Sequence, residues 1–285
     1  MNRARPDGRA VPIIVNADDF GYFDAVSQGI LQAAEAGVVT ATGVMANGPA
    51  LDRWVDHLRS LSGLSVGVHL NASLGAPLTS AMAAALAAHG GQFPSKGRVA
   101  SALLLGRLPI DTLLTEWHQQ IRRCIELGLR VEFVNSHEHL HILPGVYNRV
   151  RRLAMDLGIR HVRAPQPEWG PSFTAGGLVR SAVFAGARLL GSDAVPAEPV
   201  LIGVARSGRL DIEYCRWRFA RLKRSRVYEL MCHPGRIDPL AQSIPSLAAY
   251  HDWEGEFSLL TSPAFDGLLR EHGLQLASYA DVDRA

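Results

Sequence analysis

The sequence lacks the features that mark several common protein classes. Its three cysteines, Cys124, Cys215 and Cys232, lie far apart and form no CxxC pair. A disulfide framework and a cysteine-based zinc knuckle are therefore not indicated, and free thiols in a reducing compartment are expected. No apolar run approaches the roughly 18 residues of a membrane span. The run Val11 to Val15 behind the basic N-terminus is too short for a signal peptide. We therefore expect a cytoplasmic protein without a membrane span.

The sequence also has little net charge. Lys+Arg 29 against Asp+Glu 27 leave +2 with neutral histidines, and no long basic block is present. Nucleic-acid binding is therefore not indicated. Nothing in the composition distinguishes a monomer from a homodimer, so a homodimer is left open.

What the sequence does contain is a regular alternation of strand-like and helix-like segments. Apolar runs typical of buried strands occur at 12–15, 38–45, 64–70, 131–134, 159–162, 227–232 and 274–277. Most of the segments between them repeat apolar residues at helical spacing. Such alternation predicts a parallel sheet with helices outside. About seven units favour an α/β fold of the distorted (β/α) barrel kind, similar to a TIM barrel, over an open sheet.

Two stretches interrupt this rhythm, at about 75–110 and about 165–210. Both are rich in small residues or prolines, and we interpret them as loop insertions that shape a substrate pocket. No internal repeat or low-complexity linker divides the chain. The prediction is one domain over residues 1–285.

The chemically active side chains share one position, the carboxyl ends of the predicted strands. In a parallel barrel these ends form a single rim, where active sites are built. Residues that are far apart in the chain would then face one common pocket. The set comprises Asp18, Asp19, His69, His137, His139, His141, Arg163 and His233.

The adjacent acids Asp18 and Asp19 follow the first strand. A cap for the helix beginning near Asp24 is the simpler explanation. Two neighbouring carboxylates at a buried strand end are costly, however, unless a cation or a proton offsets their charge. This favours a functional pair.

The sharpest local signal is the run Ser136-His137-Glu138-His139-Leu140-His141. A lone histidine is usually structural, but three at alternate positions directly after a strand favour a metal site. Imidazole binds zinc and similar divalent ions, and a mixed histidine and carboxylate set leaves a position for water. An extended backbone would direct His137 and His141 to one side and His139 to the other.

Three further residues are weaker signals that gain weight from their place on the rim. His69 lies in a strand, where a lone histidine is more often structural. His233 is either a loop cap or a general acid facing the metal. Arg163 is a plain salt-bridge partner, an orienting group for Asp18, or a contact to substrate oxygens.

Four motifs together resemble the YdjC-like carbohydrate deacetylases of the ChbG/HpnK type. They are Asn16-Ala17-Asp18-Asp19-Phe20-Gly21, Gly67-Val68-His69-Leu70-Asn71, Asn135-Ser136-His137-Glu138-His139-Leu140-His141 and Glu229-Leu230-Met231-Cys232-His233-Pro234-Gly235. They occur in the family's order, and the resemblance spans from residue 13 to about 282. Each motif is weak alone, and the four together are specific.

The resemblance implies one divalent metal ion, Mg²⁺ or Zn²⁺, held by Asp19, His69 and His137. It implies Asp18 as general base and His233 as general acid. Arg163 is then an expected substrate contact, and His139 and His141 are expected either as substrate contacts or as residues that support the metal ligands.

The implied activity is removal of the N-acetyl group from an acetylated amino sugar, as an oligosaccharide or a glycolipid. Two alternatives remain. One is a metal-dependent isomerase or aldolase on the same barrel, and the other is a non-catalytic carbohydrate-binding protein. Release of acetate from an N-acetylated sugar distinguishes them.

Overall fold

A computed structural model describes residues 10–164, 166–169, 175–191 and 199–283. Its strands are β1 (Val11–Phe20), β2 (Ala41–Val44), β3 (Ser65–Leu70), β4 (Val131–Ser136), β5 (His161–Val162), β6 (Val200–Ile202), β7 (Tyr228–Cys232) and β8 (Leu274–Leu276). All their pairings are parallel. The alternation of buried strands with helices is therefore confirmed.

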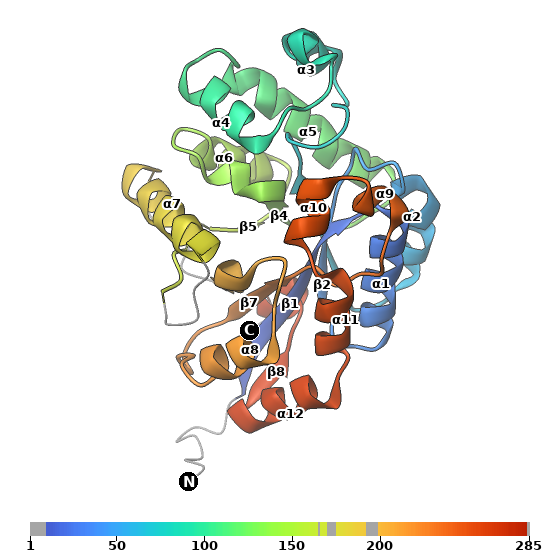
Figure 1. The fold of residues 1–285 in the computed structure, drawn as a ribbon, viewed down its shortest axis with the longest axis vertical. Helices are drawn as coiled ribbons and strands as arrows, with labels where there is room; N and C mark the ends of the chain where they lie inside the picture. The colour runs from blue at the N-terminus through green and yellow to red at the C-terminus, as the bar shows by residue number, and fades with distance from the viewer. Residues whose placement is uncertain (1–9, 165, 170–174, 192–198, 284–285) are drawn as a thin grey trace.

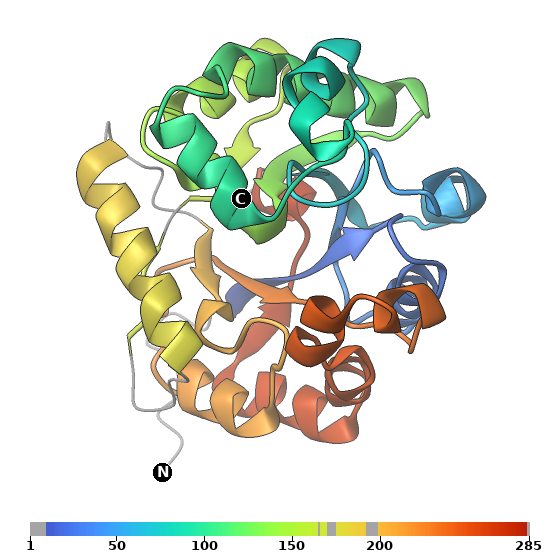
Figure 2. The ribbon, with the colours of Figure 1, turned by 45° about the horizontal axis from the view of Figure 1, so that its top comes forward.

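The strands form one curled sheet, in the order β5-β4-β3-β2-β1-β7-β6, with β8 also paired to β1. Within the described residues, the end strands β5 and β6 do not pair with each other, so the barrel is incomplete. Figures 1 and 2 show β1 running through the middle of the molecule, with helices around the outside of the sheet. The predicted distorted barrel is confirmed.

Amphipathic helices cover the sheet at the spacing that the sequence predicts. They include α1 (Asp24–Glu35), α2 (Leu51–Ser60), α5 (Ile110–Glu126), α6 (Tyr147–Asp156), α8 (Ile212–Phe219) and α12 (Pro263–His272). The side chains that recur at helical spacing, such as Ile30, Val55, Ile121 and Val150, are buried against the strands. This burial is the main stabilising contribution of the helices, since helix propensity alone is weak.

The predicted insertions contain regular structure. The first holds α3 (Ser80–Ala85), η1 (Ala87–His89) and α4 (Lys96–Leu104). The second holds α7 (Ala175–Gly191), β6 and η3 (Val204–Arg206), while residues 165, 170–174 and 192–198 lie outside the described part. The interpretation of 165–210 as a loop insertion alone was wrong, because β6 pairs with β7. Three residues are too short a run for periodicity to reveal a strand.

The chain between β7 and the last strand forms a series of short helices, α9 (Pro239–Gln242), α10 (Pro245–Tyr250), α11 (Trp253–Leu260) and α12, and α13 (Tyr279–Val282) follows β8. Side-chain caps begin several of them. Asp238, Asp252 and Ser262 each accept a hydrogen bond from a backbone N–H in the first turn. These helices position His251 and Glu256 beside the sheet rim.

Two expectations about the chain as a whole can be compared with the structure. The three cysteines are free and buried, and burial raises the pKa of the Cys124 thiol to about 12. Among the described residues, no helix combines the length and apolarity that crossing a bilayer requires. The cytoplasmic location, the single domain and the homodimer stay predictions.

Candidate metal centre and active site

The two aspartates lie within β1 rather than after it. β1 continues to Phe20, and its register with β2 shifts between Ala17 and Phe20. Asp19 has a φ of 74°, a left-handed conformation that is rare for a residue with a side chain. Such an irregularity redirects successive side chains. The carboxylates of Asp18 and Asp19 consequently meet different sets of partners.

Asp19, His69 and His137 form a buried cluster of three potential metal ligands. One ligand atom from each residue lies within 4.8 Å of the others. Oδ1 of Asp19 is 2.8 Å from Nδ1 of His137 and 3.2 Å from Nε2 of His69. A carboxylate and two imidazoles are a donor set that suits a divalent metal ion. The strands β1, β3 and β4 bring these residues together from distant parts of the chain.

The ring of His69 is held by the residues around it. Its Nδ1 lies 2.7 Å from Oδ1 of Asn135, so Nε2 is the nitrogen that faces Asp19. Gly43 of β2 provides the space, because a Cβ there would lie 3.1 Å from Oδ1 of Asp18 and 3.2 Å from Cβ of His69. An outer partner on the second ring nitrogen is the usual way in which proteins orient a metal-binding histidine.

The electrostatics of the cluster favour an ionised carboxylate. Burial opposes ionisation, but His137 and His69 outweigh it and hold the pKa of Asp19 well below its usual value. Burial likewise opposes protonation of His137, while Asp19 raises its pKa. The cluster thus concentrates negative charge on Asp19, where a cation would sit.

Asp18 belongs to a separate buried ion-pair network. Arg163 donates to its Oδ2 at 2.6 Å and its Oδ1 at 3.1 Å, and Nδ2 of Asn135 donates to Oδ1 at 2.8 Å. Arg163 also donates to Oε1 of Glu229, at 2.5 Å and 3.0 Å, and Asn16 donates to the same oxygen at 2.7 Å. Burial opposes ionisation of Asp18, but Arg163 and His69 hold its pKa at about 2. Asp18 is therefore a fixed, ionised carboxylate.

The triple-histidine run is not extended, and the prediction that alternate residues face opposite sides was wrong. Residues His137–Ile142 form the short 3₁₀ segment η2, in which Glu138 and His139 have left-handed φ values of 54° and 58°. Non-glycine residues in this region are strained and cluster at functional sites. Together with Asp19 they are the three such residues in the described structure.

The three histidines of η2 consequently have three different environments. His137 faces Asp19. His141 is fully buried, with Nδ1 2.6 Å from Oγ of Ser136 and Nε2 2.8 Å from the carbonyl oxygen of Arg163. His139 has a buried Nδ1 without a protein partner among the described residues. Burial, reinforced by Arg163 and His141, holds the pKa of His139 well below its usual value. Of the two outer histidines, His139 is the one with a nitrogen still open.

His233 lies just after β7, on the same rim. Its backbone N–H donates to Oε2 of Glu256 at 2.5 Å, and its Nδ1 lies 3.9 Å from the same oxygen. No residue in the described part of the chain forms a hydrogen bond with this Nδ1. The ring of His251 lies 4.9 Å from that of His233. Burial lowers the pKa of His251 to about 3. His233 contributes to this lowering, and Asp19 partly opposes it.

Four residues of the site were not predicted. Asn135 and Glu229 occur in the motifs, and their buried positions next to strand ends were a usable signal. Glu256 and His251 follow a region of short helices in which nothing marks one polar residue over another. The eight predicted residues lie at or near the carboxyl ends of the strands, whereas Glu229 is the second residue of β7 and reaches them through Arg163.

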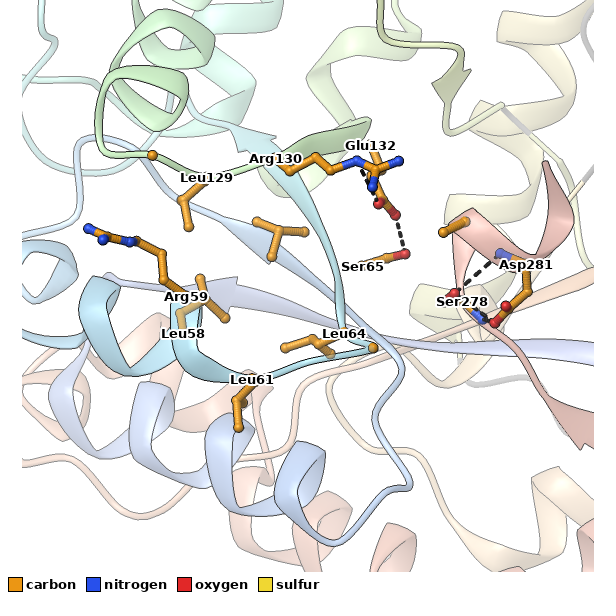
Figure 3. A pocket seen from close by; sticks show the side chains of 14 residues that line it. Leu58, Arg59, Leu61, Leu64, Ser65, Leu129, Arg130, Glu132, Ser278 and Asp281 are labelled. Atoms are coloured by element: carbon orange, nitrogen blue, oxygen red, sulfur yellow. Dashed lines mark hydrogen bonds and ion pairs between the residues drawn. The ribbon is translucent and has the colours of Figure 1, made fainter. Parts of the chain in front are cut away.

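A cavity of about 460 Å³ lies at the opposite end of the sheet (Figure 3). It is lined by the start of β3 and the turn before β4, and its polar groups are already paired. Ser65 donates to Glu132, and Ser278 donates to Asp281. Residues Gly63 to Gly67 match the GxSxG pattern of serine hydrolases. Ser65 is the first residue of β3, at the end of the sheet opposite the histidines. It is therefore too far from them to act as a nucleophile that a histidine activates.

The order and spacing of the site motifs match a known protein family. The profile of the YdjC-like protein family matches residues 12–271. This chain belongs to that family. The match includes every residue of the metal cluster and of the ion-pair network around Asp18.

Two relatives of this YdjC-like protein are similar over nearly their full length. A chitooligosaccharide deacetylase of Klebsiella pneumoniae (strain 342) is 32% identical over 275 residues, which are 95% of this chain and 98% of that protein. A carbohydrate deacetylase of Geobacillus stearothermophilus is 31% identical over 278 residues, which are 94% of this chain and 96% of that protein.

A solved structure supports the fold of the YdjC-like chain. The crystal structure of an Enterococcus faecalis V583 protein, described as a cellobiose-phosphate cleavage protein, superimposes with a TM-score of 0.72 at 23% identity. The match covers 96% of this chain and 99% of that chain. This likeness shows the fold alone.

Proposed function

We propose that this YdjC-like protein is a metal-dependent carbohydrate N-deacetylase, which hydrolyses the acetamide of an N-acetylated amino sugar. The observation that carries the proposal is the adjacency of two units. The Asp19–His69–His137 cluster lies beside the ionised Asp18, and both lie on the rim that carries His233. The activity named for two relatives that cover nearly the whole chain supports the same reaction.

Asp19, His69 and His137 are the proposed ligands of one divalent metal ion. Once bound, such an ion supplies Lewis acidity, which polarises the acyl carbonyl and lowers the pKa of a bound water. Two imidazoles among three ligands favour zinc-like ions over magnesium. Asn135 orients His69 for this role.

Asp18 is the proposed general base. With a pKa of about 2, its carboxylate stays ionised at neutral pH and in mild acid. Arg163 and Asn135 hold both of its oxygens in place. A carboxylate of low pKa is a weak base, so it needs a water whose own pKa has been lowered by the metal ion. Arg163 is itself buried between two carboxylates, which raise its pKa, so it stays charged and keeps Asp18 in place.

His233 is the proposed general acid, because an amine leaves poorly without a proton. Glu256 holds its backbone N–H and lies 3.9 Å from its Nδ1. His233 is also one of the smaller causes that lower the pKa of Asp18.

His139 is the proposed substrate contact, since its Nδ1 is buried without a protein partner. His141 has both nitrogens occupied, so we assign it to holding the carbonyl group of Arg163. An N-acetylated amino sugar, as an oligosaccharide or linked to a lipid, is the substrate class that fits the named relatives.

The decisive test is acetate release by protein stripped of metal and then reloaded with Zn²⁺, Co²⁺, Mn²⁺ or Mg²⁺. N-acetylglucosamine and N,N′-diacetylchitobiose are the first substrates. We expect release only after reloading, and a reduction of about 10²–10⁴-fold in the Asp18→Asn variant. Conversion of sugar without acetate release would instead indicate an isomerase or aldolase. Sugar binding without any turnover would indicate a binding protein.

A further inference from the structure

One short segment, residues 251–256, holds the turn that carries the proposed acid His233. This segment joins α10 to α11 and includes the first turn of α11. Oε2 of Glu256 accepts a hydrogen bond from the backbone N–H of His233 at 2.5 Å. The carbonyl group of Trp253 accepts one from the N–H of Gly235 at 3.0 Å. The backbone on both sides of Pro234 is therefore fixed by the same segment.

The segment also contacts the side chain of His233, through a series of three rings. The ring of His251 lies 4.9 Å from that of His233, tilted by 58°. On its other contact, it is nearly parallel to the ring of Trp253, at 13° and 5.0 Å between centroids. Trp253 is buried and meets Phe23 edge-on. Because close-packed rings leave few orientations open to a neighbour, His251 limits how the imidazole of His233 can turn.

A separate loop clamps the chain on both sides of His251. The N–H of Asp252 donates to the carbonyl group of Gly208 at 2.7 Å, and Arg209 donates to that of Ala249 at 2.6 Å. Gly208 has a φ of 79°, and a Cβ there would lie 2.8 Å from an aromatic ring of α10. This close approach requires glycine. The backbone that carries His251 is thus anchored independently of His233.

The contact between the two histidines is one of shape. Nδ1 of His233 and Nδ1 of His251 are both buried, and no described residue forms a hydrogen bond with either atom. The rings are therefore joined by packing rather than by these nitrogens. Burial also lowers the pKa of His251 to about 3, so at neutral pH its ring is uncharged and is not the proton donor. An uncharged ring packs beside a protonated imidazole without repelling it.

We propose that His251 is a positioning residue, whose ring fixes the orientation of the His233 imidazole. The kinetic consequence rests on the proposed function, in which His233 protonates the leaving amine. The geometric part does not, because the rings are in contact whichever reaction the site performs. Displacement of a catalytic group by about 1 Å can cost about 100-fold in rate. A flat ring at position 251, with or without nitrogens, is what the site requires.

Three substitutions at position 251 test the proposal in the full chain reloaded with Zn²⁺. His251→Ala should lower kcat for acetate release from N,N′-diacetylchitobiose by about 10–100-fold, with KM unchanged. His251→Phe keeps a flat ring and should recover most of this loss. His251→Asn keeps hydrogen-bonding groups without the ring and should not; it also replaces the alanine variant if that one unfolds. A raised KM, with recovery by asparagine instead of phenylalanine, overturns the proposal and indicates a substrate contact.

A double-mutant cycle checks that His251 acts through His233. In the His233→Ala background, the further change His251→Ala should leave kcat unaltered, because the group that it positions is gone. An equal loss in both backgrounds overturns the proposal, since it indicates a general structural effect.

The matched control is His272→Ala. Like His251, His272 is partly exposed, contacts an aromatic ring (that of Phe219) and has a buried ring nitrogen without a partner among the described residues. It ends α12, just before β8 begins, at the end of the sheet opposite the site. Its removal should leave kcat at the wild-type value. A loss equal to that of His251→Ala overturns the proposal.

Crystal structures of the variants separate this inference from the proposed reaction. The ring of His233 should be rotated or occupy two conformers in His251→Ala, and should keep its wild-type orientation in His251→Phe. An unmoved ring in His251→Ala overturns the inference even if acetate is released. Absence of acetate release from the wild type would instead contradict the proposed function, while the ring orientations would still decide whether His251 positions His233.

Discussion

Arg163 donates to both carboxylate oxygens of Asp18, and the same guanidinium group donates to Glu229 on its other side. One cation thus lies between two buried anions. Removal of a partner from a buried network leaves an uncompensated charge. This relationship makes the ion-pair network both a stabilising element and the support of the proposed base.

Replacement of Arg163 by methionine should lower the free energy of unfolding by about 3–5 kcal/mol, because Asp18 and Glu229 are left unpaired. Urea denaturation measures this change. The double variant Arg163→Met/Glu229→Leu should recover part of the loss, since only one carboxylate remains uncompensated. Arg53→Met, which breaks an exposed pair with Asp24, is the control, with a change of about 0–1 kcal/mol. Equal effects at the two arginines would contradict the network's importance.

Asp18→Asn should reduce kcat for acetate release by about 10²–10⁴-fold, the usual contribution of a general base. Metal binding should be retained, because Asp18 is outside the Asp19–His69–His137 cluster. Steady-state kinetics and metal analysis of the same preparation check both points. Asp56→Asn, at an exposed aspartate, is the control. If kcat survives in Asp18→Asn, another group is the base.

Asn135→Ala should weaken metal affinity by about 10–100-fold, as loss of an outer partner of a metal-binding histidine usually does. Asn135→Asp keeps an oxygen acceptor for Nδ1 of His69, but it loses the donor to Asp18 and repels that carboxylate, so it should recover only part of the affinity. Calorimetric titration with Zn²⁺ measures both variants. Unchanged affinity in Asn135→Ala would show that His69 is oriented by other contacts or is not a ligand.

The buried neutral histidines predict a loss of stability in mild acid. Burial lowers the pKa of His141 to about 3, against about 6.5 in an unfolded chain. The unfolded state therefore binds the proton first, and stability falls as the pH decreases from 6.5 towards 3. His141 alone should account for about 2 kcal/mol between pH 7.5 and pH 5. Unfolding of His141→Gln should be less pH-dependent over this range. His118→Gln, on the exposed side of α5, should match the wild type.

Much of the fold follows from the sequence, because strand burial and helix amphipathicity are periodic. The exceptions have physical reasons. β6 is three residues long and lies in a proline-rich stretch, so it is too short to show the alternation of apolar and polar residues that marks a strand. β1 continues through Asp18 and Asp19, where polar residues end the apolar run, and pairs with β2 again at Phe20 after a register shift.

The site could be predicted down to its location but not its contacts. The carboxyl ends of parallel strands converge, so the strand-end rule brought eight residues to one rim. The rule says nothing of backbone strain, and the left-handed Glu138 and His139 changed which histidines face inward. Glu256 could not be predicted, because its role arises from tertiary contacts with His233 and Leu210.

The pairing of β1 sets the order in which the protein can mature. This strand is synthesised before all of its partners, yet it lies between β2 and β7 and also pairs with β8. The segment that carries Asp18 and Asp19 therefore waits for partners that are synthesised much later. Competence for chemistry should arise only after β8 has been synthesised, and translation products that stop before β8 should be inert rather than partly active.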